Sequence, residues 1–192
     1  GVCRLLLEKN LSLSLPALIE LARAQFPQKD VQEKSNAADI YAFIIDRLRA
    51  YLRDQSVAGK PFTSAEIDAV LSQEPEQIND LIQRLTALRE FNALTEAAQL
   101  ASANKRISNI LKKTTTAIPA ACSAKLLQIP AEAKLHQALE SITPTLSTAY
   151  EKRQFVELLK ALVALSAPID QFFADVMVMD PNPELRDNRL AL

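Results

Sequence analysis

Hydrophobic residues recur at helical spacing along almost the whole chain. The clearest segment runs from Ala37 to Asp54, and its apolar stripe repeats every four residues: Ile40, Ile44, Leu48 and Leu52. Such a period places these side chains on one face of a helix. Asn36 stands immediately before the segment, where its side chain can accept a hydrogen bond from the first free amides. The pattern therefore predicts a helix over residues 37–54.

Similar patterns and their boundary signals predict helices through the rest of the chain. Thr63 and Glu66 have the spacing of a capping box, and Pro130, Pro144 and Pro168 suit the first turns of helices. Expected helices cover residues 1–10, 15–26, 63–73, 75–91, 94–113, 130–142, 145–165 and 168–176, with a last one from Glu184. The sequence thus predicts an all-α bundle of about 8–10 helices.

The domain organisation is expected to be simple. We expect one helical domain over residues 1–192, with residues 1–30 leading in from an upstream domain. The weakest internal joint is the polar, β-branched stretch Thr114–Pro119. The first residue is not Met and the last four residues read as mid-helix, so we expect both ends to be cut from a longer chain.

Composition narrows the possible functions. The 192 residues include only two glycines, so glycine-rich phosphate-binding loops cannot be written in this sequence. Aromatic residues make up 5% and Trp is absent, which disfavours sheets that stack bases on aromatic rings. The apolar runs are short and broken by charge, so no membrane association is expected. Two distant cysteines, Cys3 and Cys122, are typical of reduced thiols in a cytoplasmic protein.

Catalytic chemistry is missing. His136 is the only histidine, and without a second histidine or a paired cysteine it cannot form a usual zinc site. No glycine-flanked serine is present to serve as a nucleophile. We therefore expect this chain to be non-catalytic and to hold no metal or cofactor.

Charge is segregated along the sequence although the net charge is only −1. Residues 97–131 contain no acid, and helical spacing in this stretch aligns Lys105, Ser108, Asn109 and Lys112 on one face. Cations can meet phosphates, and amides or hydroxyls can meet base edges or the 2′-hydroxyl of RNA. A second basic cluster contains Arg47, Arg49 and Arg53. Solvated helix faces are the alternative explanation for both clusters.

Three stretches resemble one protein family. Residues 168–192, PIDQFFADVMVMDPNPELRDNRLAL, are similar to the ending of bacterial glycyl-tRNA synthetase β subunits. Residues 103–113, ANKRISNILKK, and residues 43–53, FIIDRLRAYLR, resemble two further helices of that family. The resemblance covers essentially the whole chain. It identifies the chain as similar to the C-terminal anticodon-binding domain of these subunits, which is of the DALR type.

The resemblance carries expectations about function. It implies an anticodon-binding domain of a glycine–tRNA ligase, which would help the parent enzyme attach glycine to its tRNA in the cytoplasm. It implies glycine tRNA and the α subunit as partners in a tetramer of two α and two β subunits, with ATP and magnesium used through the α subunit. The tRNA-facing candidates are residues of three helices: Arg47, Arg49, Arg53, Asn104, Lys105, Asn109, Lys112, Arg186 and Arg189.

Several alternatives stay open from the sequence. Arg186 and Arg189 can either contact RNA or tie the last helix to the bundle. Tyr51 can stack on a base or fill the core, whereas Phe172, Phe173, Met177 and Met179 are expected in the core. For the chain as a whole, a protein-interaction or assembly module with little RNA contact is the main alternative. An unrelated helical enzyme is the second.

Overall fold

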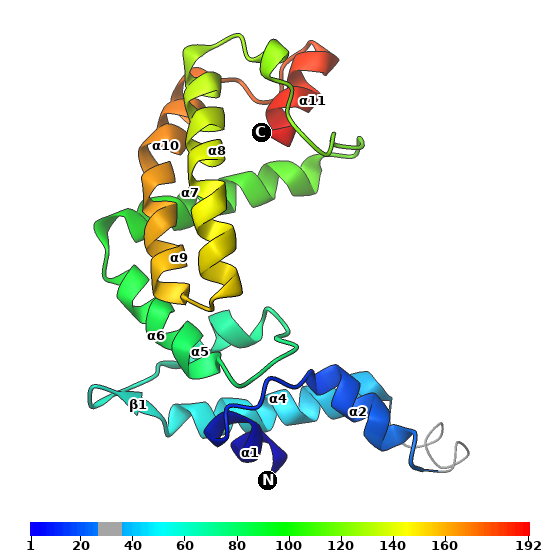
Figure 1. Cartoon of the computed structure of the whole chain (residues 1–192). Helices are drawn as coiled ribbons and strands as arrows, with labels where there is room; N and C mark the ends of the chain where they lie inside the picture. The colour runs from blue at the N-terminus through cyan, green and yellow to red at the C-terminus, as the bar shows by residue number, and fades with distance from the viewer. Residues whose placement is uncertain (27–35) are drawn as a thin grey trace. The chain divides into compact units, whose positions relative to one another are not determined.

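The computed structural model describes residues 1–26 and 36–192, and the regular secondary structure of this part is almost entirely helical. This confirms the all-α class. The first part of the chain contains α1 (Val2–Glu8), α2 (Leu15–Arg23), α4 (Ala37–Arg53), a hairpin of β1 (Ser56–Val57) and β2 (Lys60–Pro61), and α5 (Ser64–Leu71) (Figure 1). The rest contains α6 (Leu81–Asn92), α7 (Thr95–Lys113), η1 (Ala124–Leu126), α8 (Pro130–Glu151), α9 (Phe155–Leu162), η2 (Val163–Leu165), α10 (Ser166–Asp175) and α11 (Pro183–Ala191).

The chain forms two compact units, residues 1–89 and 90–192. The sequence led us to expect one domain whose weakest joint is Thr114–Pro119. The division between the compact units falls instead between Arg89 and Glu90, inside α6.

Local capping signals place the helices of the first unit. The Asn36 side chain accepts a hydrogen bond of 2.8 Å from the Asp39 amide, as expected for the cap of α4.

The start expected for the helix after Pro75 is wrong, because α6 begins only at Leu81. The Pro75 carbonyl accepts from the Tyr41 hydroxyl, and the Glu76 carbonyl accepts from the Leu15 amide. These partners from other elements hold the segment before α6 outside a helix.

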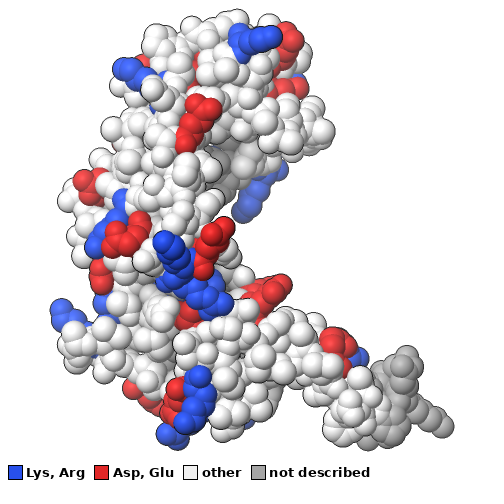
Figure 2. All heavy atoms as spheres, viewed as in Figure 1, with Lys and Arg blue, Asp and Glu red and all other residues white. Residues whose placement is uncertain are grey.

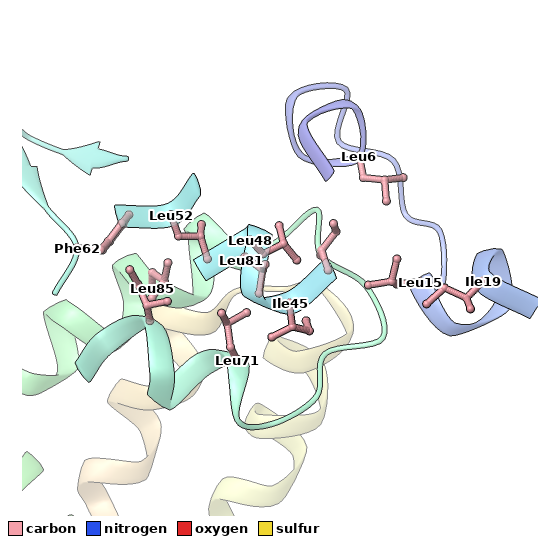
Figure 3. Packing of buried hydrophobic residues seen from close by; sticks show 12 residues of the cluster. Leu6, Leu15, Ile19, Ile45, Leu48, Leu52, Phe62, Leu71, Leu81 and Leu85 are labelled. Carbon is pink, nitrogen blue, oxygen red and sulfur yellow. The ribbon is translucent and has the colours of Figure 1, made fainter. Parts of the chain in front are cut away.

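The hydrophobic core of the first unit joins all of its helices. Leu48 and Leu52 of α4 are completely buried, and Leu81 and Leu85 of α6 face the same cluster (Figure 3). The expected stripe of α4 is only partly confirmed: Ile45 is buried, whereas Ile40 and Ile44 are half-buried at the edge of this cluster.

Arg89 ties three elements of the first unit together. Its guanidinium donates to both oxygens of Glu66 at 2.8 and 2.9 Å, and to the carbonyls of Lys60 and Pro61. It also lies 4.4 Å from the centroid of the Phe62 ring. Glu66 in turn accepts from the Thr63 amide and completes the capping box expected from the sequence. Arg89, with help from Thr63, lowers the pKa of Glu66 from 4.5 to about 2.

In the second unit, α8 differs from the sequence-based expectation. Pro144 does not start a helix but lies inside α8, which runs unbroken from Pro130 to Glu151. The helix ends where Arg153 takes a positive φ of 54°, and the Gln154 amide donates back to the Ala149 carbonyl. A left-handed residue at this point closes a helix C-terminus. Helices α9 and α10 pack along α8 (Figure 1).

The last helix is attached to α8 by a buried ion pair. Arg189 of α11 donates to Glu132 of α8 at 2.5 Å and to Asp180 at 2.6 Å, and its side chain is 5% exposed. Burial alone would raise the pKa of Glu132, but bonds from the Ile129 amide, Arg189 and the Gln128 amide lower it below its ordinary value. Beside this pair, Asn188 exchanges two hydrogen bonds with the backbone of Ser123.

No helix in the described residues is both long enough and apolar enough to cross a membrane.

Glu66 should stabilise the first unit through its charge. Its folded-state pKa lies below its ordinary value, so its contribution is complete above about pH 4.5 and is lost as the pH falls toward about 2. Glu66→Gln keeps a capping oxygen and loses the charge. We expect it to lower the free energy of unfolding by about 1–3 kcal/mol at pH 7. Urea unfolding followed by circular dichroism should show a smaller deficit at pH 3; an equal deficit at both pH values would contradict the charge explanation.

Removing Arg189 should destabilise the second unit. Arg189→Met leaves the buried Glu132 carboxylate without its cation, and we expect a loss of about 3–5 kcal/mol in the free energy of unfolding. The double variant Glu132→Gln with Arg189→Met leaves no unpaired charge at position 132 while keeping a capping oxygen. It should be more stable than Arg189→Met alone in the same unfolding measurement. A double variant less stable than the single one would count against this account.

Candidate nucleic-acid interface

Helix α7 presents most of the polar face expected from the sequence: Lys105, Asn109 and Lys112 are exposed, whereas Ser108 is half-buried. Asn104, Lys105, Asn109 and Lys112 are all exposed, while Ala97 and Ala103 face the protein interior. Lys105, Asn109 and Lys112 recur at four- and three-residue intervals on a continuous helix of 19 residues, and Asn104 lies next to Lys105 in the sequence. Lys105 and Lys112 form no ion pair within the described residues, so their charges are available to an anion. We call these four residues the α7 ridge.

The basic cluster of α4 is less available than expected. Arg49 is half-buried and bonds to Asp46 at 2.5 Å and Asp68 at 2.8 Å, which raises its pKa, chiefly through the bond to Asp68. Two carboxylates neutralise its charge and tie it to α5, so we remove Arg49 from the candidate surface. Arg47 is exposed and lies 5.0 Å from the Phe43 ring centroid, and Arg53 is exposed in the last turn of α4.

Of the two arginines of α11, Arg189 stabilises the fold. Arg189 is 6% exposed, and its ion pairs with Glu132 and Asp180 leave it no access to RNA. The alternative that Arg189 ties the last helix to the bundle is therefore correct. Arg186 is half-buried and pairs with Asp187 at 3.1 Å. Its role in RNA binding stays a prediction.

The aromatic candidates pack in or against the core, whereas the two methionines are exposed. Tyr51 packs against the core of the first unit, which favours its core assignment. Phe172 is buried and Phe173 is half-buried, as expected. Met177 and Met179 are 59% and 52% exposed, so their expected core position is wrong. Burial alternates in their segment, because Val176 and Val178 pack against the core of the second unit while the two methionines stay exposed.

Arg106 makes a contact that the sequence did not lead us to expect. This residue shares α7 with the ridge, but its guanidinium lies 4.1 Å from the centroid of the Phe173 ring on α10. A second polar face of α7 can be read from residue spacing. Ser102 lies three residues after Gln99 and four residues before Arg106, so the three side chains share one side of the helix. The sequence could reveal that face, but not the aromatic ring opposite it.

The candidate residues thus lie on different compact units. Arg47, Arg49 and Arg53 belong to residues 1–89, whereas the α7 ridge and the arginines of α11 belong to residues 90–192. On the face drawn in Figure 2, most Lys and Arg side chains lie beside Asp or Glu. Exposed cations without an acidic partner in the described residues, such as those of the α7 ridge, therefore indicate an RNA-binding surface better than the number of basic residues does.

Comparison with known families identifies the class of the second unit. Residues 100–192 match the family described as DALR anticodon binding domain. The matched residues begin inside α7 and include the α7 ridge, so the ridge belongs to a domain of an anticodon-binding class.

Longer relatives match the entire chain. It is 45% identical over 192 residues to the glycine–tRNA ligase beta subunits of Dechloromonas aromatica and Leptothrix cholodnii, and 44% identical to that of Methylobacillus flagellatus. In each case all of this chain is aligned, and it spans 26% of the relative. The chain belongs to the glycine–tRNA ligase beta subunit family, and it corresponds to about a quarter of the length of these relatives.

Proposed function

We propose that this chain binds the anticodon region of glycine tRNA as part of a glycine–tRNA ligase β subunit. The observation that carries the proposal is the α7 ridge, an exposed and unpaired set of cations and amides within the residues that match an anticodon-binding family. An anticodon loop offers phosphates that Lys105 and Lys112 can neutralise. It also offers unstacked bases whose edges Asn104 and Asn109 can contact.

The proposal gives the chain a supporting role in catalysis. The chain itself is non-catalytic and takes no cofactor, while the parent ligase attaches glycine to tRNA in the cytoplasm. Activation of glycine with ATP and magnesium belongs to the α subunit. Arg47 and Arg53 of the first unit are further candidates for phosphate contacts, since both are exposed cations.

A second candidate function is assembly with the synthetase α subunit. The observation that favours it is an apolar groove of about 940 Å³ in the first unit, between α1, α2 and α4. Its lining includes Val2, Phe26 and Phe43, each about 60% exposed. Exposed apolar surface of this kind is typical of protein interfaces.

Assembly can be tested separately from RNA binding. We expect the wild-type chain to comigrate with the α subunit in size-exclusion chromatography with light scattering, and Phe43→Asp to weaken this association. Asp46→Asn, which alters an exposed residue of the same helix outside the groove, serves as the control. A chain that stays monomeric in the presence of the α subunit would reject this second function.

The α7 ridge should contribute phosphate contacts to tRNA binding. Each neutralised phosphate contributes about 0.7 to the slope of log affinity against log salt for single-stranded RNA, so Lys105→Glu with Lys112→Glu should reduce that slope by about 1.4. The dissociation constant for glycine tRNA should be measured by fluorescence anisotropy at several salt concentrations. Thermal unfolding should change little, because both side chains are exposed.

The matched control changes Lys134, an exposed cation on α8, to Glu. It alters the net charge in the same direction without touching α7, so its effect on the slope should be much smaller. Lys105→Glu and Lys112→Glu should also be measured singly. If Lys134→Glu changes the salt slope as much as either of them, the slope depends on net charge and the α7 ridge makes no specific phosphate contact. Equal, negligible binding of glycine tRNA and a non-cognate tRNA by the wild-type chain would reject the proposed function.

A further inference from the structure

A pocket with both polar and apolar lining residues lies between α7 and α10 of the second unit, beside the α7 ridge. Its volume is about 520 Å³, within the range of small-molecule sites, roughly 300–1,000 Å³. Gln99, Ser102 and Arg106 line it from α7, and Asp170 and Phe173 line it from α10. These residues face each other because the two helices pack together through small side chains, such as the buried Ala103.

One wall of the pocket is a planar stacking surface. The guanidinium of Arg106 lies 4.1 Å from the centre of the Phe173 ring, and Phe173 packs edge-on against the buried Phe172 at 5.4 Å. The ring is therefore anchored to the core, and it holds the guanidinium in place. Arg106 nevertheless remains exposed. Guanidinium planes and aromatic rings are the surfaces on which proteins stack unpaired RNA bases.

The pocket also offers a donor and an acceptor for a base edge. The Gln99 side-chain oxygen accepts from the Ser166 hydroxyl at 2.9 Å, which orients the amide and leaves its NH₂ group to donate. Asp170 is exposed and can only accept while ionised. A carboxylate acceptor favours bases with an exocyclic amino group, namely cytosine, adenine and guanine, over uracil.

The pocket lies next to the α7 ridge on the same helix. Ser102 lies three residues before Lys105, one turn along the same helix, so the pocket opens beside the first cation of the ridge. Lys105 and Lys112 can then hold the phosphates of a strand whose base enters the pocket. Side chains that position a backbone stand here beside side chains that can read a base.

We infer that this pocket binds one unstacked nucleobase carrying an exocyclic amino group, stacked on Arg106 and contacted by Gln99 and Asp170. The inference rests on the proposed function and names the base-binding subsite of the same surface. It separates two tasks on α7: the lysines position the RNA strand, and the pocket selects a base.

The test uses two variants that preserve shape. Arg106→Lys keeps the charge and removes the stacking plane, so it should weaken binding of a glycine tRNA transcript by about tenfold without changing the salt slope. Asp170→Asn replaces a pure acceptor by an amide that can also donate. The comparison transcripts carry uracil in place of single anticodon-loop bases that have an exocyclic amino group. Asp170→Asn should reduce the ratio of the affinity for the native transcript to the affinity for these transcripts. Asp175→Asn, on the same helix outside the pocket, should behave like the wild-type chain.

The outcomes separate the two proposals. If the wild-type chain binds glycine tRNA selectively but Arg106→Lys and Asp170→Asn match Asp175→Asn, the pocket inference is wrong and the proposed function stands. If the wild-type chain shows no selective binding, both fail together.

A second measurement does not depend on the variants folding correctly. The methyl groups of Ala98 and Ala174, which line the pocket, should shift in NMR spectra when the wild-type chain binds the transcript. Bound tRNA that leaves both methyl signals unchanged would overturn the pocket inference.

Discussion

The ion pair between Arg189 and Glu132 is the constraint on which the second unit depends. Glu132 caps the start of α8 through the amides of Gln128 and Ile129, and the same carboxylate holds Arg189 of α11. Arg189 also donates to the Met177 carbonyl and to Asp180, so the segment that follows α10 is held in place as well. A hydrophobic core alone is not directional, whereas a buried charge requires one specific partner geometry.

The same use of arginine explains why the charge count of this chain is misleading. Arg49, Arg89 and Arg189 are each held by carboxylates within one compact unit, and Arg84 pairs with the buried Asp80. Arg49, Arg89 and Arg189 join different elements of the fold, Arg84 pairs within its own segment, and all four offer little charge to a ligand. The exposed lysines of the α7 ridge have no such partners within the described residues. A net charge of −1 is therefore compatible with a local surface that attracts phosphate.

In the proposed complex with RNA, helix α7 would supply both phosphate contacts and a base contact. Lysines on its outer ridge are point charges on flexible stems, which suit phosphates in several positions. Arg106 is planar and is held against Phe173, so it offers a fixed surface to a base. Because all these residues stand on one helix, the spacing between phosphate contacts and base contact is set by helical geometry. Rigid spacing of this kind favours an RNA loop of one particular shape.

The sequence by itself determined the helical class, most helix boundaries and the family. Helical periodicity and caps such as Asn36 and the Thr63–Glu66 box depend on residues three or four apart, so they are legible without coordinates. It also predicted that Lys105, Asn109 and Lys112 share one face of α7, since the spacing along one helix needs no partner. Only the tertiary structure decided that Pro144 lies inside α8, that Arg49 and Arg189 serve the fold, and that Arg106 meets Phe173. Those outcomes depend on what lies against each side chain, and for Arg189 and Glu132 the two partners are 57 positions apart in the chain.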